Sequence, residues 1–238
     1  MEKFEKSMDL SKYINTNFKI RVDPFLHCVV ENFFSAEIYN QIKADYDIIL
    51  SKNLAEQYST TNFYKFSHYD AYCYIPKQDN TAARAFFYSK EWKNFISTIF
   101  SREDLSDDVL LEYHYHKPNG EAGEIHSDDE QVCFPLPEKE STEFLRAFDG
   151  SVSYRGVPNE KTITRRRTIV AILYLNDGWI PENKGQTALY RDPNDEPFLL
   201  VEPKGNTLLL FEIGEESWHR SLSLGNKERK TICFWFHT

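Results

Sequence analysis

Cysteine is scarce in this sequence. The 238-residue chain has four cysteines, no two of which have the C-x-x-C spacing, and their separations fit no zinc finger. They are Cys28, Cys73, Cys133 and Cys233. So few cysteines in a chain of this length favour a reducing compartment over a disulfide-stabilised extracellular fold. We therefore expect a cytoplasmic protein.

Long apolar runs are also missing. The longest, from Thr168 to Leu175, is far too short to span a bilayer. The N-terminal segment MEKFEKSMDLSKYI carries charges throughout and contains no apolar stretch of the kind that a signal peptide needs. Both absences predict a protein without a membrane partner.

Positive charge is the third deficit. The formal net charge is -9, and the basic residues cluster only at Arg165, Arg166 and Arg167. Proteins that bind nucleic acid normally present a basic face. The composition therefore argues against nucleic acid as a partner, although a local basic site is compatible with it.

Apolar and aromatic residues are abundant, at 41% and 15%, which is enough for a sizeable core. We expect a single domain over residues 1–238, because the chain shows no internal repeat and no linker. Residues 1–108 are expected to form a helical and strand support for the rest. They contain a strand at His27–Val30, a helix after Ser35 and a helical stretch over 81–100, each with apolar residues at the matching period.

Residues 109–238 have the pattern of a β-core, with short runs of strand-forming residues separated by turn signals such as Pro118-Asn119-Gly120. The pattern predicts an α+β, mainly β protein in which helices buttress one sheet of a sandwich or barrel. The expected strands are Val109–His116, Arg167–Asn176, Thr187–Tyr190, Phe198–Val201, Thr207–Phe211 and Lys230–Phe236.

The run from Thr168 to Asn176 is apolar on both of its alternating faces. Such a strand is expected where one face of a sheet packs on helices and the other lines a pocket.

Residues 129–164 have no clean period, are polar, and include Pro135, Pro137 and Pro158. We interpret them as an inserted loop, which could be a lid over the site or a mobile surface insertion. The loop would rejoin the core at Arg165–Arg167, whose charge could face an anionic group on a substrate or be paired with nearby Asp and Glu.

A candidate metal site begins with His126-Ser127-Asp128. On a strand, residues two apart point to the same side, so both side chains can reach one ion. His219, which precedes the last expected strand, would complete a set of two histidines and one carboxylate. That set leaves open positions on an octahedral metal and suits Fe(II) oxygen chemistry.

Arg229 and Thr231 lie on one face at the head of the last strand. A guanidinium can bind a carboxylate through two hydrogen bonds, and a hydroxyl can add a third. This is the arrangement that a dicarboxylate beside iron would need.

Several segments resemble, in order, the motifs of prolyl 4-hydroxylase-type Fe(II)/2-oxoglutarate-dependent oxygenases. The similarity covers nearly the whole chain except residues 129–164. The segments are Asp23–His27 with Asn32–Ser35, Gly123–Asp128, Leu173–Trp179 with Gly185–Thr187, Ser217–His219, and Arg229–Thr231 through Trp235.

The resemblance implies a double-stranded β-helix (a jelly-roll, cupin-like core) and a reaction that uses Fe(II), 2-oxoglutarate and O2 and releases succinate and CO2. It places the iron ligands at His126, Asp128 and His219. It places the 2-oxoglutarate contacts at Arg229 and Tyr174, with Thr231 and Tyr115 in support. Lys184 departs from the family, which usually has a glycine there.

For the substrate we expect a small molecule, an amino acid or a peptide, with an unactivated C–H bond as the point of hydroxylation. Arg165, Arg167 and Trp235 are the candidate substrate-binding residues. Trp235 occupies the position where the nucleic-acid demethylases of the superfamily carry a second arginine, which argues against that function. Asp128 is a carboxylate where the halogenases have Gly or Ala, which argues against halogenation.

Two other functions are compatible with parts of the sequence. His114-x-His116 followed by Glu121 fits the first half of a cupin metal motif, but no histidine soon follows Pro203-Lys204-Gly205 to supply the second half. The chain could also be a non-catalytic, ligand-binding β-sandwich. The sequence does not indicate an oligomeric state.

Overall fold

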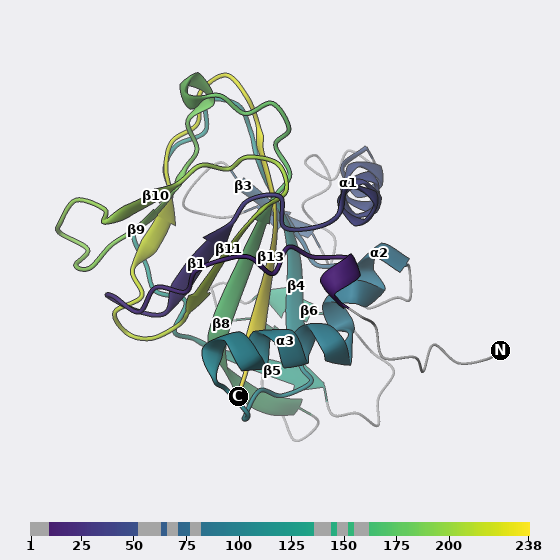
Figure 1. The fold of residues 1–238 in the computed structure, drawn as a ribbon. Coiled ribbons are helices and arrows are strands. Elements are labelled where there is room, and N and C mark those ends of the chain that lie inside the picture. The colour runs from purple at the N-terminus through teal and green to yellow at the C-terminus, as the bar shows by residue number, and fades with distance from the viewer. Residues whose placement is uncertain are drawn as a thin grey trace.

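The computed structural model describes residues 10–51, 63–65, 71–76, 82–135, 144–146, 152–154 and 162–238. It confirms the α+β, mainly β class (Figure 1). The helical elements are η1 (Leu10–Lys12), α1 (Ala36–Leu50), α2 (Ala82–Ala85), η3 (Phe86–Tyr88), α3 (Lys90–Phe100) and η4 (Pro181–Asn183). The strands are β1 (His27–Val30), β2 (Phe63–Lys65), β3 (Ala71–Tyr74), β4 (Val109–His116), β5 (Gln131–Pro135), β6 (Phe144–Arg146), β7 (Val152–Tyr154), β8 (Thr162–Tyr174), β9 (Thr187–Leu189), β10 (Leu199–Val201), β11 (Thr207–Glu212), β12 (His219–Ser221) and β13 (Arg229–His237).

Strand β8 is the centre of the larger sheet. Along one edge it pairs antiparallel with β13, and along the other it pairs first with β5 and then with β11. The remaining strands extend the sheet on both sides: β4, β3 and β2 beyond β13, β7 and β6 beyond β5, and β1 beyond β11.

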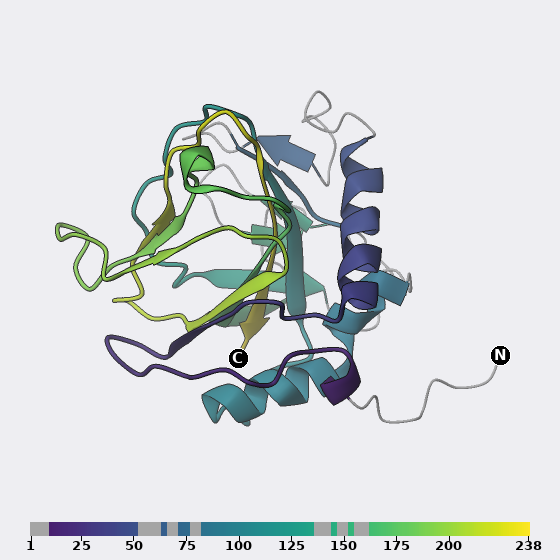
Figure 2. The same cartoon turned by 45° about the horizontal axis from the view of Figure 1, so that its top comes forward.

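A smaller antiparallel sheet, in the order β10-β9-β12, lies on the opposite side of the larger sheet from α1 (Figure 2). Helices α1 and α3 lie along the outer side of the larger sheet, and the two sheets enclose a second apolar layer. Two facing sheets with helices outside one of them form the jelly roll that the sequence resemblance implies.

The alternation predicted for the strand after Thr168 is confirmed. Ile169, Ala171 and Leu173 belong to the core cluster shared with the helices. Val170, Ile172 and Tyr174 belong to the cluster between the two sheets. Because successive side chains of a strand point to opposite faces, this one strand contributes to both cores.

Helix α1 begins after Ser35, as expected, and buries one stripe of side chains against the sheet: Tyr39, Ile42, Tyr46 and Ile49. The helical stretch expected over 81–100 is interrupted. It consists of α2, η3 and α3, because Ser89 is extended and its hydroxyl caps the amide of Trp92. A serine in this role ends one helix and starts the next.

Part of the expected loop over 129–164 is sheet instead. Its first residues form β5, which pairs with the start of β8, so that β8 begins at Thr162 rather than at Arg167. The alternating Val132 and Phe134 are buried between the sheets. Two alternating apolar residues followed by Pro135 are too short a pattern to predict a strand, so the sequence of this segment is typical of a loop. Most of the insertion lies outside the described residues, so the lid interpretation stays a prediction.

None of the described helices is long and apolar enough to cross a membrane.

Two isoleucines of α1 provide a matched test of this packing. Ile42 is 1% exposed and Ile48 is 59% exposed. We predict that Ile42→Ala lowers the free energy of unfolding by about 2–5 kcal/mol, because it removes buried methyl groups and leaves a cavity. Ile48→Ala should change it by less than about 0.5 kcal/mol. Chemical denaturation measures both, and equal losses would contradict the packing of α1.

Candidate metal and cosubstrate site

The three predicted metal ligands converge. Their ligand atoms all lie within 4.8 Å of one another. The carboxylate oxygens of Asp128 are 3.7 Å from Nε2 of His126 and 3.7 Å from Nε2 of His219. The two histidines face each other through an isolated antiparallel bridge rather than from a regular strand pair. The fold thus brings together residues that lie far apart in the sequence.

Both histidines are oriented by their own backbone. Nδ1 of His126 lies 2.9 Å from the carbonyl oxygen of Glu124, and Nδ1 of His219 lies 3.0 Å from that of Ser217. A carbonyl only accepts, so each Nδ1 carries the proton, and in the neutral ring Nε2 is left with a lone pair. Burial, followed by the nearby His126, lowers the pKa of His219 to about 4, so that this ring is neutral at pH 7.

Asp128 is held as a carboxylate by two buried side chains. Trp235 donates from Nε1 to Oδ2 at 2.8 Å, and Arg167 donates from Nη1 to Oδ1 at 3.3 Å. Burial by itself would raise the pKa of Asp128, but Arg167, the two histidines and Trp235 together hold it well below its usual range. The residue is therefore ready to bind a cation.

Arg167 reaches this position because of an irregularity in β8. Opposite Phe236 and His237, the pairing passes from Ile169 directly to Arg167, so β8 contains one extra residue. Without that shift Arg167 would share the helix-facing side with Ile169. A bulge re-aims side chains in this way. The guanidinium instead lies against the Trp235 ring, 4.4 Å from its centroid.

A second buried cation, Arg229, marks the proposed cosubstrate end. Its Nη2 donates to the hydroxyl of Thr187 at 2.9 Å, and its Nη1 lies 3.1 Å from Nε2 of His116. Burial, reinforced by Arg229, lowers the pKa of His116 well below its usual range, so the ring is a neutral acceptor. The described part of the chain supplies Arg229 with no carboxylate, and its Nε has no hydrogen-bond partner there.

Tyr174 completes this group. Its hydroxyl donates to Thr187 at 2.6 Å, and its ring lies 5.4 Å from the Arg229 guanidinium. Burial raises the pKa of Tyr174 to about 12, so the hydroxyl keeps its proton. Thr187 and His116 were not among the predicted site residues. Thr187 had a signal in the sequence, because it follows the Gly-Gln of a family motif. His116 had none, because it is brought to Arg229 by the pairing of β4 with β13.

Two supporting residues are placed differently. Thr231 is fully buried and lies next to Tyr174 in the strand register. Tyr115 lies elsewhere: it shares the helix-facing side of β4 with Tyr113 and lines a recess with Tyr46. Strand alternation directs His114 and His116 inward in its place, so the structure does not bring Tyr115 to Arg229.

The departure at Lys184 has a structural counterpart. Lys184 has φ 54° and is followed by Gly185 with φ 79°. A Cβ on Gly185 would lie 3.5 Å from Cδ of Arg229 and 3.3 Å from Leu224. Glycine is favoured at position 185 by its positive φ and by the tight approach of Leu224, while position 184 holds a lysine in a conformation that glycine adopts more easily.

The basic cluster is neutralised by carboxylates. Arg165 pairs with Asp108, and Arg166 pairs with Asp129 through two hydrogen bonds of 2.7 Å. Arg167 pairs with Asp128 and lies 3.1 Å from Glu130.

The cupin alternative is not favoured. His114 and His116 do not join the metal group: His114 lies 2.7 Å from the carboxylate of Glu112, and His116 contacts Arg229. Glu112, His114 and Cys73 instead form a separate buried cluster.

Comparison with known families gives one decisive match. Residues 113–237 match the family described as the 2OG-Fe(II) oxygenase superfamily. This segment is more than half of the chain and contains every candidate ligand named above. The chain belongs to this superfamily.

Solved structures with the same fold include a prolyl 4-hydroxylase from Pseudomonas putida, at 16% identity and a TM-score of 0.60, with 96% of this chain and 95% of that chain covered. Another is a prolyl 4-hydroxylase from Phytophthora capsici, at 19% identity and a TM-score of 0.54, with 89% of this chain and 58% of that chain covered. A third is a prolyl hydroxylase from Trichoplax adhaerens in complex with a hypoxia inducible factor peptide fragment. The identity is 14% and the TM-score 0.54, with 89% of this chain and 83% of that chain covered. At these identities the similarity shows the fold. No curated protein matches the sequence.

Membership makes this 2OG-Fe(II) oxygenase a 2-oxoglutarate-dependent dioxygenase with Fe(II), 2-oxoglutarate and O2 as its cofactors and cosubstrates. The donor set fits the metal: two imidazole nitrogens and one ionised carboxylate, all within 4.8 Å of one another.

We predict that Trp235→Phe weakens metal binding by about 10–100-fold, because it removes the hydrogen bond that orients Asp128 while keeping an aromatic ring in place. A Co(II) titration followed by absorbance measures the affinity. Trp179→Phe is the matched control, since Trp179 donates to the carbonyl of Lys184 instead. Equal affinity in wild type and Trp235→Phe would contradict a role in holding Asp128.

Proposed function

We propose that this oxygenase hydroxylates an unactivated C–H bond of a small molecule, an amino acid or a peptide, and releases succinate and CO2. His126, Asp128 and His219 hold Fe(II) in this proposal. Arg229 and Tyr174 bind the distal carboxylate of 2-oxoglutarate. Bound iron and 2-oxoglutarate together supply the activation of O2.

The observation that carries the proposal is the buried charge of Arg229. Removing a guanidinium from water costs several kcal/mol unless an anion compensates it. Its partners Thr187 and His116 are neutral and leave Nε available. A bound carboxylate would accept from the guanidinium, and the Tyr174 hydroxyl, which shares Thr187 with Arg229, would be a second donor to it.

Asp128, together with Arg167 and Trp235, which donate to it, is proposed to bind the metal. Arg167 and Trp235 fix both carboxylate oxygens, so the metal would meet a ligand whose orientation is already set. The backbone carbonyls that hold the two imidazoles do the same for the histidines. A metal held by these three residues would keep open positions, which Fe(II) oxygen chemistry requires.

Arg167 also supports a substrate contact beside the metal. Its Nε and Nη2 are buried and have no hydrogen-bond partner among the described residues. These donors suit a carbonyl or carboxylate oxygen of an amino acid or peptide. Arg165, in contrast, is paired with Asp108, which makes it the weaker candidate. Because the whole basic cluster is paired, we do not propose nucleic acid as a substrate.

Arg229→Ala tests the cosubstrate assignment. We predict that the apparent requirement for 2-oxoglutarate rises on the order of a hundredfold or more, because loss of a charge-assisted bond to a desolvated carboxylate costs about 2–5 kcal/mol. Metal affinity should change little. Arg191→Ala, which removes an exposed arginine paired with Asp23, is the control. An unchanged requirement in Arg229→Ala would assign the carboxylate to another cation, such as Arg167.

The reaction itself is tested by succinate release. Purified enzyme with Fe(II), 2-oxoglutarate and O2 should release succinate, and pools of metabolites or peptides that contain the substrate should stimulate this release. Mass spectrometry of the stimulating pool should then find a product heavier by one oxygen. If the substrate stimulates succinate release but the product has not gained an oxygen, the reaction is desaturation or cyclisation and not hydroxylation.

A further inference from the structure

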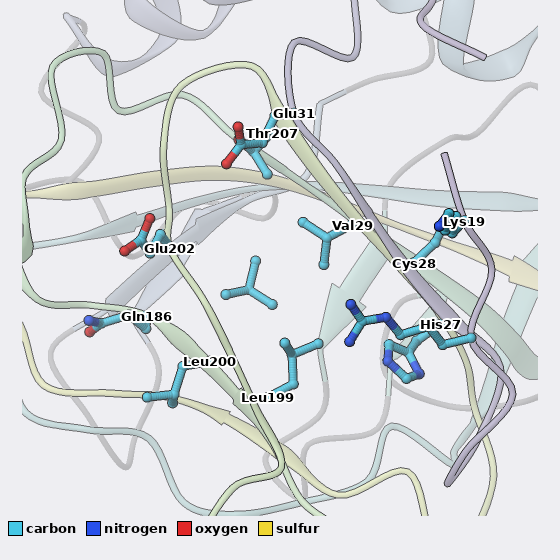
Figure 3. Close-up of a pocket in the computed structure, with 12 residues that line it drawn as sticks. Lys19, His27, Cys28, Val29, Glu31, Gln186, Leu199, Leu200, Glu202 and Thr207 are labelled. Atoms are coloured by element: carbon cyan, nitrogen blue, oxygen red, sulfur yellow. The ribbon is translucent and has the colours of Figure 1, made fainter. Parts of the chain in front are cut away.

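A second cavity lies away from the metal, between the edges of the two sheets (Figure 3). Its volume is about 390 Å³. One wall comes from β1 and the segment before it, and the other from β10. None of the metal or cosubstrate residues lines it. The cavity needs an explanation of its own.

The cavity has a cationic side. Lys19 and Arg21 line it, and neither makes a side-chain ion pair within the described ranges. Most of the other arginines whose side chains the structure describes are paired with carboxylates. Two available cations at one opening attract an anionic group, and a guanidinium suits a carboxylate in particular.

The carboxylates on the other side do not cancel this charge. Glu31 and Glu202 also line the cavity, but Lys204 pairs with both, at 3.5 Å and 2.5 Å. Figure 3 shows these two acidic side chains apart from Lys19 and His27. Lys204 offsets one of the two negative charges, so the cavity has a weakly acidic end and, opposite it, a basic end without a paired carboxylate.

His27 adds a specific hydrogen-bond acceptor. It is 1% exposed, and its Nδ1 lies 2.8 Å from the carbonyl oxygen of Phe25, so Nδ1 carries the proton. Nε2 of the neutral ring is then an acceptor, and it has no hydrogen-bond partner in the described part of the protein. A buried polar atom without a partner is uncommon and indicates a missing ligand or water.

The remaining lining is apolar. Val29, Leu199, Leu200 and Val201 contribute to it, and Val29 and Leu200 are among the exposed large hydrophobic residues of the protein. A ligand with a short branched or linear hydrocarbon body would cover these side chains and gain free energy from the buried area.

We propose that this cavity binds a small apolar carboxylate that carries a hydrogen-bond donor next to the carboxylate, as a 2-hydroxy acid does. The carboxylate meets Arg21 and Lys19, the donor meets Nε2 of His27, and the hydrocarbon body lies against Val29 and Leu200. The site is separate from the iron and 2-oxoglutarate positions and does not depend on the proposed reaction.

The test uses 2-hydroxy-4-methylpentanoate as the probe and NMR of the methyl groups of Val29, Leu199 and Leu200 as the readout. The protein, residues 1–238, is measured with Zn(II) and excess 2-oxoglutarate, so that the site around Arg229 is occupied. We expect saturable shifts of these methyl groups. The matched amide, which lacks the charge, should bind about tenfold more weakly or worse, as should Lys19→Gln with Arg21→Gln. Lys227→Gln, an exposed lysine elsewhere, should bind like wild type.

The hydroxyl is tested separately with 4-methylpentanoate. This analogue should bind several-fold more weakly than the hydroxy acid in wild type, and the difference should disappear in His27→Phe. Shifts confined to residues around the metal, equal binding of acid and amide, or no saturation at millimolar concentrations would each overturn the proposal.

Discussion

Strand β8 is apolar on both faces, and the rest of the structure depends on burying both of them. Its helix-facing residues need α1 and α3, and its inner residues need the smaller sheet. The apolar stretch of this strand has Arg167 beside Asp128 at its start and Tyr174 beside Arg229 at its end. Packing of one strand between two apolar layers therefore fixes how the metal end and the cosubstrate end lie relative to each other.

The two buried arginines, Arg167 and Arg229, differ in the charge of the residues that contact them. Arg167 is compensated within the chain by Asp128, Glu130 and the face of Trp235. Arg229 has only neutral partners in the described residues. Burial costs both guanidinium groups their hydration, and among the described residues Arg229 has no carboxylate that offsets this cost. The first cation stabilises a metal ligand, and the second is suited to a carboxylate that arrives from solution.

Much of this arrangement could be predicted, because periodicity and spacing act locally. Val109–His116 was predicted with the observed bounds, and the alternation after Thr168 gave the two cores. The His126, Asp128 and His219 group followed from motif order. Other features could not be predicted, since they depend on pairing between distant strands. The bulge that turns Arg167 inward is set by the register with β13, and Tyr115 was assigned to the site although its strand directs it to the helices.

In the proposed function, one site holds a metal through Asp128, His126 and His219 and a carboxylate through Arg229. The most direct measurement is the visible absorbance of the protein when Fe(II) and 2-oxoglutarate are added without O2. The account predicts a weak charge-transfer band that requires both additions, is lost in Asp128→Ala, and in Arg229→Ala appears only at much higher 2-oxoglutarate. A protein that binds Fe(II) but shows no band at any 2-oxoglutarate concentration would contradict the account.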